Sequence, residues 1–439
     1  MKPIPAGARR GQPSWVVVPA RRWLTAFAVA ALLIGRRPES FFAPQLWAED
    51  GPVFYAQAAA RGALRMLFEP YAGYLQFVPR LASMAAVHIP AIGVPRLYAL
   101  VAYIIAIWAC SLFIDSRFRG IVESPALRFM VCCAIAVVPP ANELIGSLTN
   151  AHWYLTLATF LLLIGEPLVG PSFAVQNMWS AAAVLLASLS AAEPLLFVPL
   201  AVWRVVTVRD AYARVVPSAL LVGSVAQIVT LAIDPTRQGP SAHVTLVTTI
   251  RATADAGVHR VLLTAIGGQA SSRFISAHGR DGLAVAALVA AAFVTAFVIT
   301  RFPRIRIRLI LLIALGLVLI AAAIDGRGLA VDYPGFRVTN YGGERYFMFP
   351  IFTLVLCVAM VLGEISALGA RTKCVCFGLI FAAGFLLDFR QPDLPDAHWP
   401  SYTGSIDRWI VARRAGLPVQ AITIPINPPG WHFRLPARS

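Results

Sequence analysis

Two adjacent carboxylates, Glu49 and Asp50, stand in the stretch Trp47-Ala48-Glu49-Asp50-Gly51-Pro52, just after the first long apolar segment of the chain. A carboxylate held at a membrane surface can accept the proton of an acceptor hydroxyl while a glycosidic bond breaks, which is general base catalysis. Asp50 also precedes a proline near a predicted first helical turn, where it could cap a helix. Both roles stay open, because one carboxylate oxygen can bind backbone N–H groups while the other faces a substrate.

The elements that must position this pair are membrane helices. The chain has 439 residues, of which 58% are hydrophobic and 13% charged, and its mean hydropathy is +0.71. A soluble fold could not hide so much apolar surface. We predict an all-α polytopic membrane protein with about eleven transmembrane helices, in a range of roughly 10 to 13. The segment 73–90 is ambiguous, and the predicted spans are 14–35, 96–114, 126–140, 152–168, 177–191, 194–207, 215–233, 282–300, 307–324, 347–367 and 373–388.

Basic residues predict the orientation, because Lys and Arg stay on the cytoplasmic side during insertion. If 73–114 is one crossing, the segments placed inside carry 17 basic and 5 acidic residues. The N-terminus is then cytoplasmic, and residues 49–50 and the C-terminus lie outside; a first span that is a cleaved signal peptide would leave residues 49–50 on the same side. Arg36 and Arg37 run against this trend. The net charge of +16 is explained by a basic rim facing anionic lipid, so membrane lipid and no nucleic acid is expected as a partner.

Four outer loops are long enough to build a site, at 36–72, 139–152, 234–281 and 325–346. In the first loop, polar residues spaced four apart predict an amphipathic surface helix from Val53 to Glu69; they are Gln57, Arg61, Arg65 and Glu69. The long loop 234–281 is predicted to be partly helical and to cover a cleft. Residues 1–388 form the membrane domain, and 389–439 form a small non-cytoplasmic segment in which Ile422-Thr423-Ile424 indicates a short strand.

Further candidate site residues lie at the edges of predicted spans. Glu143, Asn150 and His152 are polar groups at a span boundary, where each must find a partner, structural or functional. Arg345 follows Gly342-Gly343 and is suited to binding a phosphate, although it could equally snorkel or pair with its neighbour. Residues predicted to contact substrate are Glu143, Asn150, Tyr341 and Glu344.

Several other chemistries lack a motif. The six cysteines lie in or beside apolar segments and read as small apolar fillers, without a CxxC pair or zinc spacing. The sequence contains neither a Walker loop nor a GxSxG motif, which removes support for nucleotide-driven transport and serine hydrolysis.

The order of these parts resembles the GT-C superfamily of integral-membrane glycosyltransferases. The matching elements are the basic N-terminus and first span, Glu49-Asp50 opening an amphipathic helix, the run Pro70-Tyr71-Ala72-Gly73-Tyr74, and a later outer turn with Glu143. The resemblance covers the general plan of residues 1–388. It implies a polyprenyl-phosphate-linked sugar as donor, a glycan, lipid or protein acceptor of the cell envelope, and a multi-pass location in a bacterial-type inner or plasma membrane.

In that family the acidic residue of the first loop is the catalytic base, which here would be Asp50, with Glu49 second. The leaving phosphate needs cations, which Arg345, with Arg80 or His152 in reserve, could supply. One base opposite a phosphate leaving group predicts inversion at the anomeric carbon. The chain departs from the family at the second outer motif, where Glu143 and His152 replace an Asp pair. A divalent metal, Mg or Mn, therefore stays possible, and no cofactor is assigned.

Two rival classes share the predicted membrane plan. A polysaccharide or lipid transporter or flippase would need ionisable residues deep in helices, for which Glu193 beside Pro194 is the main candidate. A lipid-linked oligosaccharide polymerase or ligase would carry Arg and His in an outer loop, which residues 234–281 partly satisfy.

Overall fold

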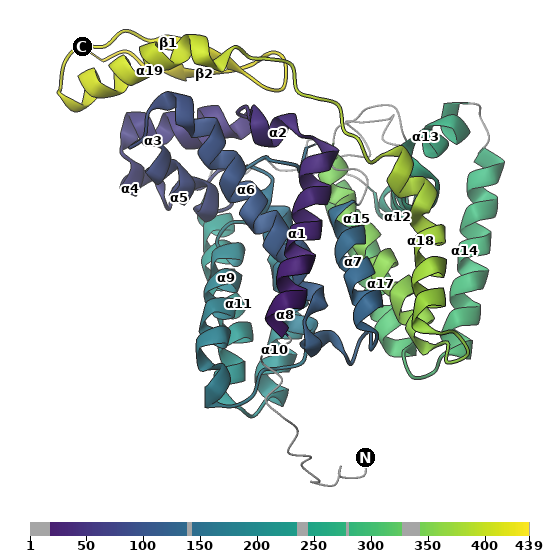
Figure 1. Ribbon diagram of the computed structural model, residues 1–439. Coiled ribbons are helices and arrows are strands. Elements are labelled where there is room, and N and C mark those ends of the chain that lie inside the picture. Colours follow the sequence, from purple (N-terminus) through teal and green to yellow (C-terminus); the bar gives the residue numbers. More distant parts are fainter. Residues whose placement is uncertain (1–17, 138–142, 235–244, 278–280, 327–342, 439) are drawn as a thin grey trace.

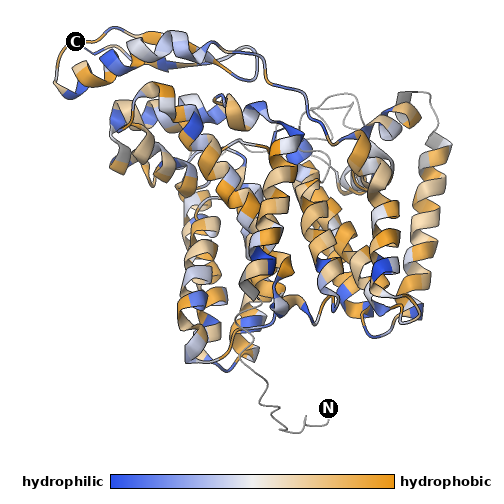
Figure 2. Cartoon of the chain, viewed as in Figure 1, coloured by the Kyte–Doolittle hydropathy of each residue, from blue (hydrophilic) through white to orange (hydrophobic). Residues whose placement is uncertain are grey.

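The described part of the chain is a helical bundle with a small appendage at its C-terminal end (Figure 1). The computed structural model describes residues 18–137, 143–234, 245–277, 281–326 and 343–438. Hydrophobic residues dominate the helices of the bundle, and hydrophilic residues are more frequent at the turns and in the appendage (Figure 2). The single sheet of the described residues is a two-stranded antiparallel hairpin, so the all-α prediction holds for the bundle and not for the appendage.

Every apolar segment predicted to span the membrane contains a helix. These helices form the bundle, and some of them directly follow short 3-10 turns such as η7 (Glu193–Phe197) and η9 (Glu344–Phe347). They are α1 (Val18–Arg36), α6 (Val94–Ser111), α7 (Pro125–Ala136), α8 (Ala151–Ile164), α9 (Ala174–Ser188), α10 (Val198–Thr207), α11 (Ala211–Ile233), α14 (Asp281–Arg301), α15 (Arg306–Gly326), α17 (Met348–Glu364) and α18 (Ala370–Leu387).

The predicted count of about eleven spans is not supported by the lengths of these helices. Among the described residues, five helices are long and apolar enough to cross a membrane; they lie at Ala91–Ile114, Ala211–Ile233, Arg306–Ile324, Glu344–Glu364 and Ala370–Leu387. Helix α8 has only 14 residues, which at 1.5 Å per residue is about 21 Å, against a hydrocarbon core of about 30 Å. It is apolar on all sides because neighbouring helices bury it, and hydropathy does not separate burial in protein from burial in lipid.

Basic turns from distant parts of the sequence meet at one end of the bundle. Arg22 near the start of α1 pairs with Asp115, and Arg308 donates to the Gly120 carbonyl. Short 3-10 turns lie here, namely η4 (Leu112–Ile114), η5 (Ser116–Phe118) and η6 (Pro171–Phe173). Arg204 at the end of α10 donates to the Gly165 carbonyl at 2.8 Å. The turns that the sequence assigns to the cytoplasmic side thus form one basic end, and α1 runs from it to the opposite end, which we call the site end.

The first loop is not the single amphipathic helix that its polar spacing predicts. It contains α2 (Glu39–Phe42), η1 (Ala48–Asp50), the π-helix η2 (Gly51–Tyr55), α3 (Ala56–Arg61), α4 (Ala63–Met66) and α5 (Phe77–Ala86). The prediction is wrong at Gly62, whose φ of +94° lies in the left-handed region and separates α3 from α4. Arg61 still reaches Glu69 across the break, with 3.0 Å between Nη1 and Oε1.

The C-terminal segment covers the first loop at the site end (Figure 1). It consists of α19 (Trp399–Arg414), β1 (Ile422–Ile426) and β2 (Trp431–Leu435), so the predicted strand at Ile422-Thr423-Ile424 is confirmed. Trp399 donates from Nε1 to the Ala91 carbonyl of η3 (Ala91–Gly93) at 2.9 Å. The segment shares an apolar core with Tyr55 and its neighbours in the first loop.

The predicted long loop contains α12 (Leu246–Ala256), the π-helix η8 (Gly257–Leu263) and α13 (Thr264–Ala277), which has a kink at Gly268. Its described part is therefore helical. It packs against α18, where the Gln269 backbone N–H donates to Asp388 at 2.7 Å.

Candidate functional site

The Asp50 carboxylate is buried and held by neutral donors. Asp50 is 1% exposed. Its Oδ1 accepts from the Thr149 backbone N–H at 3.0 Å and from Thr149 Oγ1 at 2.7 Å, and its Oδ2 accepts from the Trp47 N–H at 3.1 Å. Asp50 makes no capping hydrogen bond to η2, the helix that follows it, so the cap predicted there is wrong, and its carboxylate forms a capping box with Trp47 at the start of η1. The carboxylate also joins the first outer loop to the turn before α8.

Burial gives this carboxyl group an unusual acidity. Loss of water raises the pKa of Asp50 to about 7, with the negative charge of Glu49 adding to the rise and the Thr149 and Trp47 hydrogen bonds opposing it. Asp50 has no ion-pair partner among the residues described by the structure. A carboxyl group with a pKa near neutrality can take up and release a proton under physiological conditions.

The backbone on both sides of Asp50 is held by the C-terminal segment. Ala48 has a φ of 44°, which a non-glycine residue adopts only when its surroundings hold it there. Its N–H donates to the Asn427 carbonyl of the C-terminal segment at 2.6 Å. A Cβ on Gly51 would lie 2.7 Å from Phe433 Cδ1 and 2.9 Å from Ile426 Cδ1, so only glycine fits under the hairpin. The C-terminal segment therefore packs directly onto the turn that carries Asp50.

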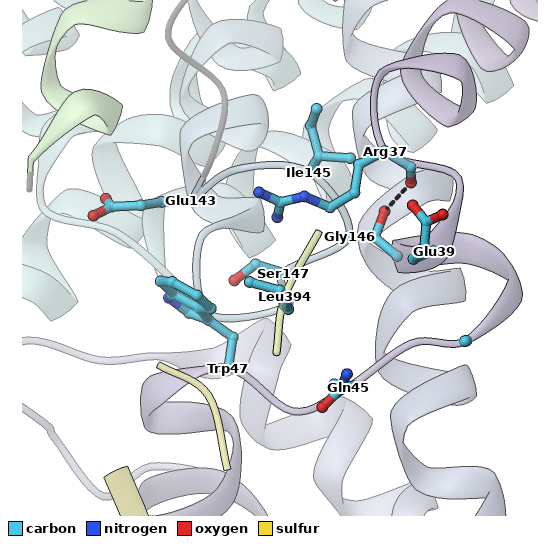
Figure 3. Close-up of a pocket in the computed structure, with 11 residues that line it drawn as sticks. Arg37, Glu39, Gln45, Trp47, Glu143, Ile145, Gly146, Ser147 and Leu394 are labelled. Carbon is cyan, nitrogen blue, oxygen red and sulfur yellow. Dashed lines mark hydrogen bonds between the residues drawn. The ribbon is translucent and has the colours of Figure 1, made fainter. Parts of the chain in front are cut away.

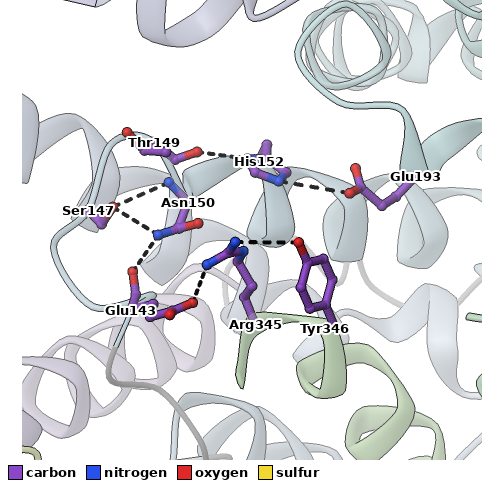
Figure 4. Close-up of polar contacts among 8 residues, drawn as sticks. All are labelled: Glu143, Ser147, Thr149, Asn150, His152, Glu193, Arg345 and Tyr346. Atoms are coloured by element: carbon purple, nitrogen blue, oxygen red, sulfur yellow. Dashed lines mark hydrogen bonds and ion pairs between the residues drawn. The ribbon is translucent and has the colours of Figure 1, made fainter. Parts of the chain in front are cut away.

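Polar groups continue from Thr149, which binds Asp50, along the turn before α8 (Figure 4). The Thr149 carbonyl lies 2.7 Å from His152 Nδ1, and His152 Nε2 lies 4.0 Å from Glu193 Oε1. Asn150 donates from Nδ2 to the Glu143 carbonyl at 2.7 Å and to Ser147 Oγ at 3.2 Å. Asn150 and His152 thus shape the turn that presents Thr149 to Asp50.

The Arg345 guanidinium is neutralised by Glu143 at the other side of this turn. The two side chains form an ion pair between η9 and residues 143–150, with Arg345 31% and Glu143 11% exposed (Figure 4). Arg345 Nη2 also lies 3.4 Å from the Tyr346 hydroxyl, and its Cζ lies 4.9 Å from the centre of the Tyr346 ring. Arg345 therefore pairs with Glu143, and not with Glu344 as considered from the sequence.

A small pocket opens beside these groups (Figure 3). Its volume of about 20 Å³ suits a water molecule and not a sugar ring. Arg37 lies at its wall, Trp47 borders it next to Asp50, and Glu143 and Ser147 come from the turn before α8. Leu394 of the C-terminal segment lines it as well.

The structure brings together most of the residues chosen from the sequence. Asp50, Glu143, Asn150, His152 and Arg345 are linked through one turn, and Glu49 is a partly buried neighbour of Asp50. Glu344 is buried nearby, at 2% exposure. Arg80 belongs to a different group, because it lies on α5 and contacts Gln57 and the Phe54 ring. Tyr341 lies outside the described residues.

Sequence reasoning missed a group of buried cations at the site end. Arg36 donates to the carbonyls of Phe389 at 3.1 Å, Asp388 at 3.2 Å and Ala136 at 3.2 Å, and Arg37 is equally buried. Arg260 lies 4.9 Å from the centre of the Phe347 ring, and Glu344 acts electrostatically on all three arginines. In the sequence, Arg36 and Arg37 differ from the other basic residues because they fall on the predicted outer side, whereas Lys and Arg normally stay on the cytoplasmic side. Thr149 carried no signal in the sequence.

The described residues contain no group of three or more His, Cys, Asp or Glu side chains arranged to hold a metal ion, and we derive no step through a metal. Comparisons with protein-family models, curated proteins and solved structures find no match to this chain.

Proposed function

We propose that this protein is a membrane glycosyltransferase, which moves a sugar from a polyprenyl-phosphate donor to a cell-envelope acceptor with Asp50 as general base. The observation that carries the proposal is the burial of Asp50 between Thr149 and Trp47, which raises its pKa to about 7 without a cation to hold it ionised. A base of that pKa matches the operating pH and accepts a hydroxyl proton as the donor bond breaks.

The arrangement of charges suits the rest of the reaction. Arg345 pairs with Glu143, and Arg37 lines the pocket that Glu143 also lines; cations there would stabilise the phosphate that leaves the sugar. Glu143, Asn150, Glu344 and Tyr341 stay proposed substrate contacts, with His152 as a second phosphate contact and Glu49 as the second base. A single displacement at the anomeric carbon gives an inverted product.

The membrane placement is part of the proposal. Long apolar helices make this a membrane protein, and the basic end supports a cytoplasmic location for the turns that carry Arg204 and Arg308. The site end then faces the non-cytoplasmic side, with the C-terminal segment. Because the pocket beside Trp47 is smaller than a sugar, the acceptor must widen it on binding.

Replacement of the base tests the proposal. Asp50→Asn keeps the shape of the side chain and removes its basicity, so we expect transfer from a polyprenyl-phosphate sugar to fall by about 100-fold or more. Glu49→Gln, at the second candidate base, should lower transfer less than Asp50→Asn does. Unchanged transfer in both variants, at normal expression, would exclude this site.

The same assay separates the rival classes. A transporter or flippase would move lipid-linked glycan between leaflets of vesicles without forming a new glycosidic bond. A polymerase or ligase would transfer a preassembled oligosaccharide and not a single sugar. Mass spectrometry of the product distinguishes these outcomes from the transfer of one sugar.

A further inference from the structure

Arg80 is a buried cation whose hydrogen bonds are incomplete. It lies on α5 and is 2% exposed. Its Nη1 donates to Gln57 Oε1 at 3.1 Å, and its Cζ lies 5.9 Å from the centre of the Phe54 ring. Its Nε and Nη2 are buried and have no hydrogen-bond partner in the part of the chain that the structure describes.

These two nitrogens form one recognition face. In a guanidinium group, the N–H of Nε and one N–H of Nη2 point in the same direction and match the spacing of two oxygens on a phosphate or carboxylate. The third nitrogen, Nη1, is the one that Gln57 occupies. Gln57 therefore holds Arg80 through Nη1, and Nε and Nη2 have no hydrogen-bond partner among the described residues.

Among the described residues, no acidic side chain accepts a hydrogen bond from Nε or Nη2 of Arg80. The acidic residue that acts on Arg80 is Glu69, and its carboxylate is paired with Arg61 at the surface, at 3.0 Å. A buried charge without a partner destabilises the protein. An oxyanion that reached Nε and Nη2 would remove this cost, so the contact would supply most of the binding free energy of the anion. Arg345 is different, because Glu143 already neutralises it.

The segment that carries Arg80 exposes apolar side chains. Leu64, Phe68 and Leu81 are 72%, 62% and 44% exposed, and all three come from the segment that contains α4 and α5. Phe68 packs on Phe77 with 5.5 Å between ring centres. An anion joined to an apolar chain matches this combination, since its chain can cover the exposed side chains while its head reaches the cation.

We propose that Arg80 binds the phosphate group of a lipid through Nε and Nη2, with Gln57 holding the guanidinium in place. The chemistry is shared by a polyprenyl phosphate and by an anionic phospholipid. If the lipid is the polyprenyl phosphate, Arg80 is a further contact for the donor lipid besides the cations near Glu143, and that assignment rests on the proposed function.

Binding to the full-length protein in detergent tests the proposal. Native mass spectrometry would compare a short-chain polyprenyl phosphate, phosphatidylglycerol and inorganic phosphate. We expect Arg80→Gln to weaken lipid binding by about tenfold or more. Arg80→Lys should weaken it by several-fold, because a lysine keeps the positive charge and cannot donate two parallel hydrogen bonds to one phosphate. Arg65→Gln, an exposed arginine of the same segment, is the matched control and should change affinity by less than about twofold.

A second variant separates binding from structural damage. Gln57→Glu has the same shape and places a carboxylate against Nη1, so it should neutralise Arg80. We expect this variant to have a higher melting temperature and a lower affinity for the lipid phosphate. A loss of affinity caused by misfolding would instead accompany a lower melting temperature.

The lipid whose binding depends on Arg80 determines what kind of site this is. Arg80-dependent binding of the polyprenyl phosphate identifies a contact for the donor lipid, and Arg80-dependent binding of phosphatidylglycerol alone identifies a membrane-lipid site. Wild-type affinity for both lipids in Arg80→Gln and in Gln57→Glu would overturn the proposal, as would Arg80-dependent binding of inorganic phosphate alone. If lipid binding depends on Arg80 while Asp50→Asn retains transfer, the proposed base is wrong and the lipid site at Arg80 stands. If lipid binding does not depend on Arg80 while Asp50→Asn loses transfer, the lipid site is wrong and the proposed base stands.

Discussion

Asp50 and Glu143 are carboxylates at the two sides of one turn, and the structure treats them in opposite ways. Asp50 is 1% exposed and accepts hydrogen bonds from neutral groups, while Glu143 is 11% exposed and faces the Arg345 guanidinium. Loss of water favours the protonated form of Asp50, and its hydrogen bonds from Thr149 and Trp47 only partly oppose this effect. Asp50 is therefore able to exchange a proton near neutral pH, and Glu143 anchors Arg345.

The largest expected effect is the pH dependence that follows from Asp50. Its pKa is raised from 3.8 to about 7 in the folded protein, so the folded state binds the proton more tightly than the unfolded state. The stabilisation by protonation is complete below about pH 4 and is lost as the pH rises through about 7, a change on the order of 4 kcal/mol. Catalysis requires the ionised form, so transfer should rise over the range in which stability falls.

Thermal unfolding and transfer rates, measured in detergent from about pH 4 to pH 8, check this opposition. Asp50→Asn should flatten the part of the melting-temperature profile that lies between about pH 4 and pH 7. Glu143→Gln should leave that part of the profile in place. Equal profiles for wild type and Asp50→Asn would contradict the burial argument.

The ion pair of Glu143 and Arg345 should give the next largest effect. Either Glu143→Gln or Arg345→Gln leaves a partly buried charge without its partner, and we expect a loss of about 2 to 3 kcal/mol of unfolding free energy. The double variant should lose less than the two single losses together, because no charge remains unpaired.

Arg390→Gln provides the control for this cycle. It breaks a pair with Glu39 in which the two side chains are 54% and 45% exposed, with 3.4 Å between Nη2 and Oε2. Such a pair contributes less than about 1 kcal/mol. Additive losses at Glu143 and Arg345 would show that their contact contributes no coupling.

Thr149 should have a smaller effect that acts through Asp50. Thr149→Val removes the hydroxyl that donates to Asp50 at 2.7 Å and keeps the side-chain volume. A lost hydrogen bond to the ionised form costs about 1.5 kcal/mol, or roughly tenfold in transfer rate, and moves the pKa of Asp50 further upward. The midpoint of the pH–rate profile should shift to higher pH, and Thr149→Ser should restore it. An unshifted midpoint would mean that Thr149 holds the turn without tuning the base.

The smallest effect is expected at Gly51. Gly51→Ala places a methyl group 2.7 Å from Phe433 Cδ1, so the hairpin must move slightly, at a cost of about 1 kcal/mol. Limited proteolysis of the C-terminal segment should become faster. Gly257→Ala meets no atom within 4 Å and should leave the cleavage rate unchanged. Equal rates in both variants would show that the hairpin does not depend on this contact.

The sequence was a good guide where one local signal sufficed. Apolar runs located the helices of the bundle, because an apolar surface of helical length must be buried in lipid or in protein. They overestimated the spans, since α8 is enclosed by other helices. The polar stripe in the first loop failed at Gly62, where one backbone angle outweighs a periodic pattern.

The sequence by itself determined the helical bundle, the short C-terminal strand and the choice of Asp50, Glu143 and Arg345 as chemically capable groups. Only the tertiary structure decided their partners: Thr149 for Asp50, Glu143 for Arg345, and Gln57 for Arg80. Each partner is tens to hundreds of residues away or on another helix, so no local pattern encodes it. Whether an ionisable group becomes a base, an anchor or a binding site depends on burial and neighbouring charge, which exist only after the chain has folded.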